Sequence, residues 1–336
     1  MLRNAMDLLR SVASVHRPSR FPNVFIFALP RGGSTWLMEL IWSQPGFKTC
    51  NEPLDVRKLQ IQKHLGINGW VDLYDRSSTP KLQRYFNRLC TGKLGFLNPL
   101  PLPGGFYRPI TRRIVFKVIH GAEDRAGWLA DSFNGRVTVL LRHPIAVSLS
   151  RQDYPNLEAF IASDYRRHFT PEQFRYARML IDTGSKLQRG VLAWCLANKV
   201  LLREATSDWA VVSYEQLVLD PIPLLQHLAA KLDLPAPKRM IERLPVPSAV
   251  KGKSDEVTQE LLEQRDSDQK RHRLVDKWRD QVSKSDEQML LEILDRFELD
   301  TYRVGDVYPA ERFRIPSAPS SAGSAALPSA AQGQSQ

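Results

Sequence analysis

A short apolar segment followed by a glycine-containing turn and a helix constrains the fold of this chain more than any other feature. The run from Val24 to Ala28 has five consecutive apolar residues, which is typical of a strand buried on both faces of a parallel sheet. From Ser34 onward, apolar side chains recur at helical spacing until Gln44, Pro45 and Gly46 end the pattern. The sequence therefore predicts a strand-turn-helix unit near the start of the chain.

The same alternation continues to about residue 300. Further strands are expected over residues 47–50, 114–119, 137–141 and 209–212, and further helices over 144–152, 185–204 and 221–232. A late helix is expected over 286–297, with Ser285 as its N-cap. Strands that alternate with helices predict an α/β fold, with a P-loop-like, doubly wound parallel sheet flanked by helices.

Three segments depart from the alternation. The two terminal segments flank a single predicted domain over residues 21–315, and the third is an insert within it. Residues 1–20 are amphipathic and rich in Arg, which predicts a short N-terminal helix; an organelle presequence is the alternative. Residues 55–113 are polar and then rich in Pro and Gly, so we expect a helical or irregular insert on the acceptor side of a cleft. Residues 316–336 are uncharged and are almost all Ser, Ala, Pro, Gly and Gln, so a disordered tail is expected.

Charge and cysteine content narrow the function classes. The 336 residues include 47 Lys and Arg against 36 Asp and Glu, a formal net charge of +11, which favours an anionic partner. The basic residues are scattered, so a nucleic-acid-binding patch is disfavoured. The apolar stretch 21–30 is about half the length of a membrane-spanning helix. The three cysteines match no metal or disulfide spacing, which favours a reducing, cytoplasmic compartment.

The turn after the first strand has the composition of an anion site. Its residues are Arg31, Gly32, Gly33, Ser34 and Thr35. Glycines let the backbone approach a ligand closely, and the free amides at a helix start favour an anion. The hydroxyls and the guanidinium add donors for a phosphate or sulfate group. The Gly-Lys-Ser/Thr of nucleotide triphosphate loops occurs nowhere in the chain, and a glycine turn with a capping serine is the alternative interpretation.

A second anion motif is expected after the strand at 137–141. Arg142 lies where that strand ends, at the edge where α/β sheets bind ligands. Pro144 suits the first turn of a helix, and Ser150 lies about two helical turns further on. Arg142 and Ser150 are therefore candidates to clamp an anion. The alternatives are a helix cap or an ion pair for Arg142 and a solvent-facing position for Ser150.

Together, the two motifs resemble those of the sulfotransferases that use 3′-phosphoadenosine 5′-phosphosulfate (PAPS), in motif style the carbohydrate and bacterial-type members. Residues 30–37 are similar to the 5′-phosphosulfate loop, the trio at 142, 144 and 150 to the 3′-phosphate motif, and residues 212–217 to a segment near the adenine pocket. The resemblance covers roughly residues 21–300. It implies that the 5′-phosphosulfate is held by Arg31, Gly32, Gly33, Ser34 and Thr35, the 3′-phosphate by Arg142 and Ser150, and the adenine by Trp36 and Tyr214. For Trp36 and Tyr214, core packing is the alternative.

The resemblance also implies the reaction, which is transfer of a sulfuryl group from PAPS to a hydroxyl or amine, without a metal. The product from PAPS is 3′,5′-adenosine bisphosphate, and Arg31 would stabilise charge on the departing oxygen. Residues 52–54 are similar to the Glu-Pro-Leu of carbohydrate sulfotransferases, so the expected acceptor is a carbohydrate, a glycolipid or a small metabolite.

An acceptor hydroxyl needs a general base, and two residues compete for this role. We favour Glu52, for which an ion pair with Arg57 or Lys58 is the alternative. His120 lies in a segment similar to the Lys-Thr-His of the cytosolic branch but one residue longer, and one residue along a strand reverses the side-chain direction. Its alternative is a partly buried strand-end histidine. Lys117 is expected to contact the sulfuryl group.

Two basic clusters are candidates to cover the nucleotide, and two other function classes stay open. The clusters are residues 251–253 and 277–279, and solvated loops are the alternative for both. A P-loop kinase or hydrolase is disfavoured by the missing Gly-Lys-Ser/Thr. A non-catalytic module that binds a sulfated glycan or an anionic lipid would leave Arg31, Glu52 and Arg142 without a joint task.

Overall fold

The apolar runs of the sequence form neighbouring strands of one parallel sheet. The computed structural model describes residues 14–95, 108–246 and 268–316. Within these ranges, a five-stranded sheet has the order β3-β5-β2-β6-β7 and all of its pairings are parallel. Its strands are β2 (Asn23–Ala28), β3 (Phe47–Asn51), β5 (Arg113–Val118), β6 (Gly135–Leu141) and β7 (Ala210–Ser213). The predicted α/β fold with a parallel sheet is confirmed.

The central strand β2 contributes side chains to two separate hydrophobic cores, which explains why its sequence is almost wholly apolar. Phe25 and Phe27 belong to the core on one face, while Val24 and Ile26 belong to the core on the other. All four side chains are at most 1% exposed. Because successive side chains of a strand point to opposite faces, a strand covered on both sides has no polar alternation.

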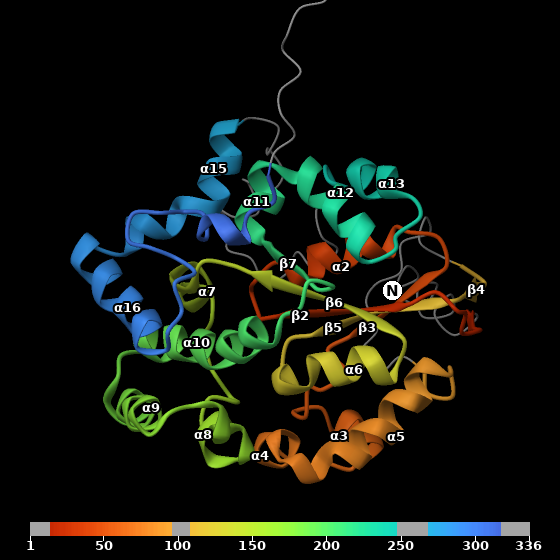
Figure 1. Ribbon diagram of the computed structural model, residues 1–336, viewed down its shortest axis with the longest axis horizontal. Coiled ribbons are helices and arrows are strands. Elements are labelled where there is room, and N and C mark those ends of the chain that lie inside the picture. The colour runs from red at the N-terminus through yellow and green to blue at the C-terminus, as the bar shows by residue number, and fades with distance from the viewer. Residues whose placement is uncertain (1–13, 96–107, 247–267, 317–336) are drawn as a thin grey trace, which may run out of the picture.

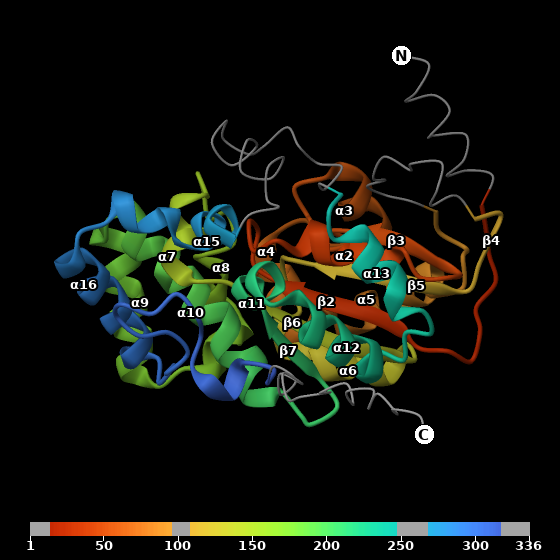
Figure 2. The ribbon, with the colours of Figure 1, turned by 90° about the horizontal axis from the view of Figure 1, so that it is seen from above.

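Helices cover both faces of the sheet, as a doubly wound fold requires (Figure 1). One face carries α2 (Ser34–Trp42), α11 (Tyr214–Leu219), α12 (Pro221–Lys231), α13 (Pro237–Arg243) and α15 (Asp268–Asp276). The core of the other face includes α6 (Ala126–Ser132), α7 (Pro144–Leu149), α8 (Ala159–Ala162), α9 (Pro171–Thr183), α10 (Lys186–Glu204) and α16 (Lys284–Arg296). Figure 2 shows that α7, α9, α10, α15 and α16 gather at one end of the molecule.

The segment between β3 and β5 is helical in its described part. It contains α3 (Leu59–Leu65), α4 (Trp70–Tyr74), a 3₁₀ turn η1 (Arg76–Ser78) and α5 (Thr79–Cys90), which lie beyond α6 in Figure 1. A short strand β4 (Ile110–Thr111) then pairs in parallel with β1 (Val15–His16). Most of the Pro- and Gly-rich run of this insert lies outside the described residues. Its position on the acceptor side stays a prediction.

Two helix boundaries differ from those expected by two residues or more. Helix α7 ends at Leu149 instead of residue 152, so Ser150 caps the helix rather than lying inside it. Helix α16 begins at Lys284, because Ser283 accepts the backbone N–H of Asp286 and is the N-cap in place of Ser285. The two serines offer nearly the same capping pattern, and only one fits the approach of the chain. Of the predicted N-terminal segment 1–20, residues 1–13 lie outside the described residues, while the described residues 14–20 contain strand β1 and no helix. Of the predicted C-terminal tail, only residue 316 is described.

Candidate functional site

The predicted site residues line up along the carboxyl edge of the sheet. In sheet order, Glu52 follows β3, Lys117 is the second-to-last residue of β5, residues 29–35 follow β2, Arg142 follows β6 and Tyr214 follows β7. Ligands of open α/β sheets bind outside the carboxyl ends of the strands. Segments that are far apart in the sequence therefore meet at the edge where a nucleotide is expected.

The phosphate loop, residues 29–35, has an unusual backbone. Arg31 has a φ of 72° and Gly33 a φ of 88°, both in the left-handed region. The N–H of Gly32 donates to the carbonyl of Leu29 at 3.0 Å, which tightens the turn. Gly33 is the N-cap of α2, and no side chain caps the helix there. No side chain therefore caps the first amides of α2, which are the groups that would donate to an anion at a helix start.

Arg142 connects the phosphate loop to the segment after β7. Its guanidinium donates from Nη1 to the carbonyl oxygen of Arg31 at 2.7 Å. It also lies over the ring of Tyr214, with Cζ 4.2 Å from the ring centroid. The two predicted anion motifs are therefore in direct contact. The ring of Tyr214 packs against the guanidinium of Arg142 in the second motif.

Tyr214 is fitted closely against the phosphate loop. A Cβ atom added to Gly33 would lie 2.4 Å from Cδ2 of Tyr214, so glycine is required there by packing as well as by its φ. The ring of Tyr214 also meets that of Trp36 edge-on, with centroids 6.4 Å apart. Tyr214 is 8% exposed. Core packing thus accounts for much of this pair, and their contact with adenine stays a prediction.

Ser150 lies at the end of α7 and is exposed. Its Oγ donates to the carbonyl of Ala146 at 2.9 Å, one turn back in the helix. Among the described residues, no hydrogen bond joins Ser150 to Arg142. Joint binding of a 3′-phosphate by these two residues therefore stays a prediction.

Glu52 and Lys117 form the ion pair of the site. Lys117 Nζ lies 2.9 Å from Oε1 of Glu52 and donates to Oγ1 of Thr35 in the phosphate loop at 3.0 Å. The Lys117 side chain is 5% exposed and that of Glu52 is 19% exposed. Burial alone would raise the pKa of Glu52, but the charge and the hydrogen bond of Lys117 hold it below its ordinary value. At neutral pH, Glu52 is a carboxylate within reach of solvent.

The expected alternative partners of Glu52 bind another carboxylate instead. Arg57 Nε lies 2.8 Å from Asp55, and Lys58 lies at 4.0 Å from the same carboxylate. Glu52 itself has a φ of 53°, which a non-glycine residue seldom adopts. Strained backbone of this kind concentrates at functional sites, and here it occurs at both Arg31 and Glu52.

His120, the second candidate base, is 4% exposed. Arg57 lies 3.4 Å from its Nε2, and its ring lies 5.3 Å from that of Trp70 in the insert. Burial, together with the positive charges of Arg57 and Arg151, lowers the pKa of His120 to about 3. The ring is therefore neutral at pH 7. Its burial agrees with the alternative of a strand-end histidine more than with direct attack on an acceptor proton.

One network near the site escaped sequence reasoning. The backbone N–H of His143, next to Arg142, donates to Oε1 of Glu215 at 2.8 Å, and Tyr302 Oη donates to Oε2 at 3.0 Å. The His143 ring stacks on Trp278, with centroids 4.1 Å apart. Of the two basic clusters, residues 277–279 therefore lie beside the second anion motif, while residues 251–253 lie outside the described residues. The only signal of this network in the sequence was a glutamate, Glu215, directly after Tyr214.

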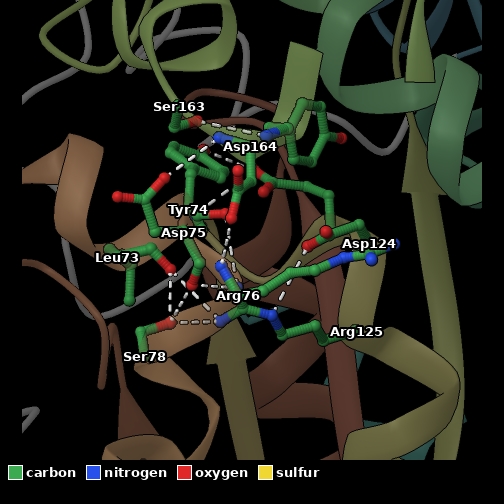
Figure 3. Close-up of polar contacts among 12 residues, drawn as sticks. Leu73, Tyr74, Asp75, Arg76, Ser78, Asp124, Arg125, Ser163 and Asp164 are labelled. Carbon is green, nitrogen blue, oxygen red and sulfur yellow. Dashed lines mark hydrogen bonds and ion pairs between the residues drawn. The ribbon is translucent and has the colours of Figure 1, made fainter. Parts of the chain in front are cut away.

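A polar clamp holds the insert beside the carboxyl edge (Figure 3). Arg125 lies in a 3₁₀ turn, η3 (Glu123–Arg125), after β5. Its guanidinium donates to Oγ of Ser78 at 2.6 Å and to the carbonyl of Asp75 at 2.6 Å, and it also reaches the carbonyls of Leu73 and Tyr74. One buried cation thus satisfies the end of α4 and fixes the insert next to the residues that follow His120.

In residues 14–95, 108–246 and 268–316, no helix is long and apolar enough to cross a bilayer. The same ranges hold no group of three or more His, Cys, Asp or Glu side chains that could bind a metal ion.

Comparison with known proteins gave structural matches only, since neither a family model nor a curated protein sequence matches this chain. The sulfotransferase domain of the Synechococcus PCC 7002 olefin synthase is 18% identical over 85% of this chain and 96% of that chain, with a TM-score of 0.44. The sulfotransferase domain of the curacin biosynthetic pathway is 17% identical over 70% and 81%, with a TM-score of 0.36. Mouse sulfotransferase SULT7A1, complexed with PAP, is 12% identical over 88% and 91%, with a TM-score of 0.39.

Proposed function

We propose that this protein is a PAPS-dependent sulfotransferase, which transfers a sulfuryl group to a hydroxyl of a carbohydrate, a glycolipid or a small metabolite. The contact between the Arg142 guanidinium and the carbonyl of Arg31 carries this proposal. It joins two anion-binding motifs at neighbouring strand ends. A ligand with one anionic group at each motif, as in an adenosine with phosphates at its 3′ and 5′ positions, suits this arrangement.

Each motif has a distinct task in this function. The amides at the start of α2, with Arg31 and the hydroxyls of Ser34 and Thr35, hold the 5′-phosphosulfate. Arg142 holds the 3′-phosphate, with Ser150 at the end of α7 as the second donor. Tyr214 and Trp36 border the adenine. What supports this assignment is the order of the strand ends, because the three segments follow the adjacent strands β2, β6 and β7.

The ion pair of Lys117 and Glu52 supplies the chemistry. The Glu52 carboxylate accepts the proton of the acceptor hydroxyl as the new oxygen–sulfur bond forms. The bond between sulfur and the 5′-phosphate oxygen breaks, and the electron pair stays on that oxygen, which leaves as adenosine 3′,5′-bisphosphate. Lys117, held between Glu52 and Thr35, is placed to stabilise this charge together with Arg31 and the loop amides. In-line positioning of donor and acceptor supplies the rest of the rate enhancement.

Ligand-induced stabilisation of the full chain tests the nucleotide part of the proposal. We expect adenosine 3′,5′-bisphosphate to raise the melting temperature in moderate salt, and radiolabelled PAPS to transfer label to members of a hydroxyl acceptor panel. Stabilisation by ATP with magnesium but not by the bisphosphate would favour a kinase or hydrolase instead. Binding of heparin or anionic vesicles that declines steadily with salt, without any response to the bisphosphate, would favour a polyanion-binding module.

A further inference from the structure

A second carboxylate lies beside the proposed base and has no task in the nucleotide site. Asp55 follows Glu52 by three residues, in the segment between β3 and α3. Its backbone N–H donates to the carbonyl of Glu52 at 3.2 Å, and its own carbonyl accepts from the N–H of Lys58 at 3.0 Å. The Asp55 side chain is only 3% exposed. Burial of a charged group is costly unless it is paired, so the partners of this carboxylate need an explanation.

The carboxylate of Asp55 binds the two cations that follow it in the chain. Its Oδ1 accepts from Nε of Arg57 at 2.8 Å and its Oδ2 from Nη2 at 3.2 Å, which is a bidentate pair. The backbone N–H of Arg57 donates to Oδ1 at 3.3 Å, and Lys58 Nζ lies 4.0 Å from Oδ2. Burial alone would raise the pKa of Asp55, but the hydrogen bond and the charge of Arg57 hold it below its ordinary value. Asp55 is therefore ionised at neutral pH.

The same two cations are within electrostatic range of Glu52. Against the effect of burial, the pKa of Glu52 is lowered mainly by Lys117, and the charge of Lys58 lowers it further. The hydrogen bond to Asp55 contributes most to the raised pKa of Arg57, and the charge of Glu52 adds to it. The side chains of Arg57 and Lys58 are 44% and 37% exposed, so neither is fixed by packing on every side. Both are thus potential partners of Glu52.

A second cation on Glu52 would oppose the proposed chemistry. A general base needs a lone pair that is available to the acceptor proton and a pKa that is not too low. Lys117 already lies 2.9 Å from Oε1 of Glu52. A further ion pair at Oε2 would lower the pKa again and would occupy the oxygen that is left to meet the acceptor.

We infer that Asp55 is a positioning residue, whose carboxylate holds Arg57 and Lys58 away from Glu52 and thereby keeps the base open to the acceptor. His120 helps to fix this arrangement, because Nη2 of Arg57 lies 3.4 Å from Nε2 of its buried ring. The inference rests on the proposed function for the role of Glu52 as a base. The choice of ion-pair partners that Asp55 imposes does not depend on that function.

Transfer of labelled sulfate by the full chain, from PAPS to a panel acceptor, tests the inference. Asp55→Asn keeps the size of the side chain and loses the charge that binds the two cations. We expect turnover to fall about ten-fold, because a charge-assisted hydrogen bond at Glu52 must then break before the carboxylate can accept a proton. Affinity for adenosine 3′,5′-bisphosphate should stay near that of the wild type. Asp72→Asn, an exposed carboxylate of α4, is the matched control. Unchanged turnover in Asp55→Asn would overturn the inference.

A second substitution distinguishes this role from a merely structural one. If Asp55 only supported the turn, the loss of another residue of that turn could not repair the damage. In Asp55→Asn/Arg57→Gln the competing guanidinium is gone, so turnover should recover most of its loss. Asp55→Asn/Lys58→Gln measures the share of Lys58 in the same way. If neither double variant recovers turnover, the assignment is wrong.

A double-mutant cycle in urea measures the exchange of partners without any substrate. In the wild type, Glu52→Gln and Arg57→Gln should change the unfolding constant additively to within about two-fold, because the two residues are not paired. In the Asp55→Asn background, the same two substitutions should show a coupling of about five-fold, the size expected of a partly exposed ion pair. Strong coupling in the wild type would refute the inference, and this arm does not require that Asp55→Asn folds.

Failure of the proposed function gives a different result. If the bisphosphate does not stabilise the wild type and no label is transferred, the sulfotransferase assignment fails. Coupling that appears only in the Asp55→Asn background would then still support the role of Asp55 in separating the charges. Additivity in both backgrounds would overturn that role, whatever the activity of the protein.

Discussion

The guanidinium of Arg142 donates a hydrogen bond of 2.7 Å to the backbone carbonyl of Arg31. These residues are separated by 111 positions, and they meet because β6 and β2 are neighbours in the sheet. The carbonyl belongs to a residue in the left-handed region, so Arg142 also stabilises the strained turn of the phosphate loop. The Arg142 side chain thus holds the backbone of the first predicted anion motif and supplies the positive charge of the second.

Removal of the Arg142 guanidinium should abolish the thermal shift that adenosine 3′,5′-bisphosphate produces. Arg142→Ala loses the charge, the contact to Arg31 and the cover over Tyr214 together. Arg142→Lys keeps the charge but not the fork of donors, and we expect it to weaken binding about ten-fold or more. Arg136→Ala, an exposed residue at the other end of β6, is the matched control. Unchanged binding by Arg142→Ala would remove the second anion site from the proposal.

A methyl group at position 33 should destroy the nucleotide site. Gly33→Ala places Cβ 2.4 Å from the ring of Tyr214 and forces alanine to a φ of 88°. The loop, the ring or both must shift, and the first amides of α2 then lose their alignment. Calorimetry with adenosine 3′,5′-bisphosphate should detect the loss. Gly69→Ala is the control, because no atom lies within 4 Å of its added Cβ. Equal affinity of the two variants would contradict the predicted packing.

Neutralisation of Glu52 should separate binding from catalysis. Glu52→Gln keeps the size of the side chain and loses the proton acceptor, so turnover should fall by roughly 10²–10⁴-fold while bisphosphate binding stays near wild type. His120→Asn should retain most of the activity, because the His120 ring is buried and hydrogen-bonded to Arg57 and is therefore not positioned to accept the proton of the acceptor. The measurement is transfer of labelled sulfate to a panel acceptor. The opposite ranking of these two variants would assign the base role to His120.

The stability of the protein should depend on pH through Glu123. Burial raises the pKa of Glu123 to about 7 in the folded protein, above its ordinary value of 4.5. Between these two values the folded state binds more protons than the unfolded state, so stability falls as pH rises, by about 3 kcal/mol at most. Glu123→Gln should therefore gain stability over the wild type between pH 5 and pH 8 in urea titrations. Glu158→Gln, at an exposed site, should not. A constant difference between Glu123→Gln and the wild type would refute the predicted ionisation.

Local patterns were sufficient for the architecture and for the places of the two predicted anion motifs after their strands. Strand runs, the glycine turn and the start of α2 depend on neighbours in sequence, so they can be predicted from a single chain. The expected strands all formed with bounds shifted by one or two residues. The capping serine of α16 was assigned wrongly, because Ser283 and Ser285 present nearly the same pattern and the path of the preceding chain selects between them.

The identity of each side chain's partner was decided only by the assembled sheet. Glu52 was expected to pair with Arg57 or Lys58 when it is not a base, yet the register that sets Asn51 opposite Lys117 gives it Lys117 instead. Arg125 carried no signal at all, since nothing in a linear sequence reveals that a guanidinium is buried against the carbonyls at the end of a distant helix. Turns and hydrophobic periodicity depend on residues that are close in sequence, so they can be predicted from the sequence. Ion pairing, burial and the shape of a cavity depend on which distant strand ends become neighbours, and that is a property of tertiary packing alone.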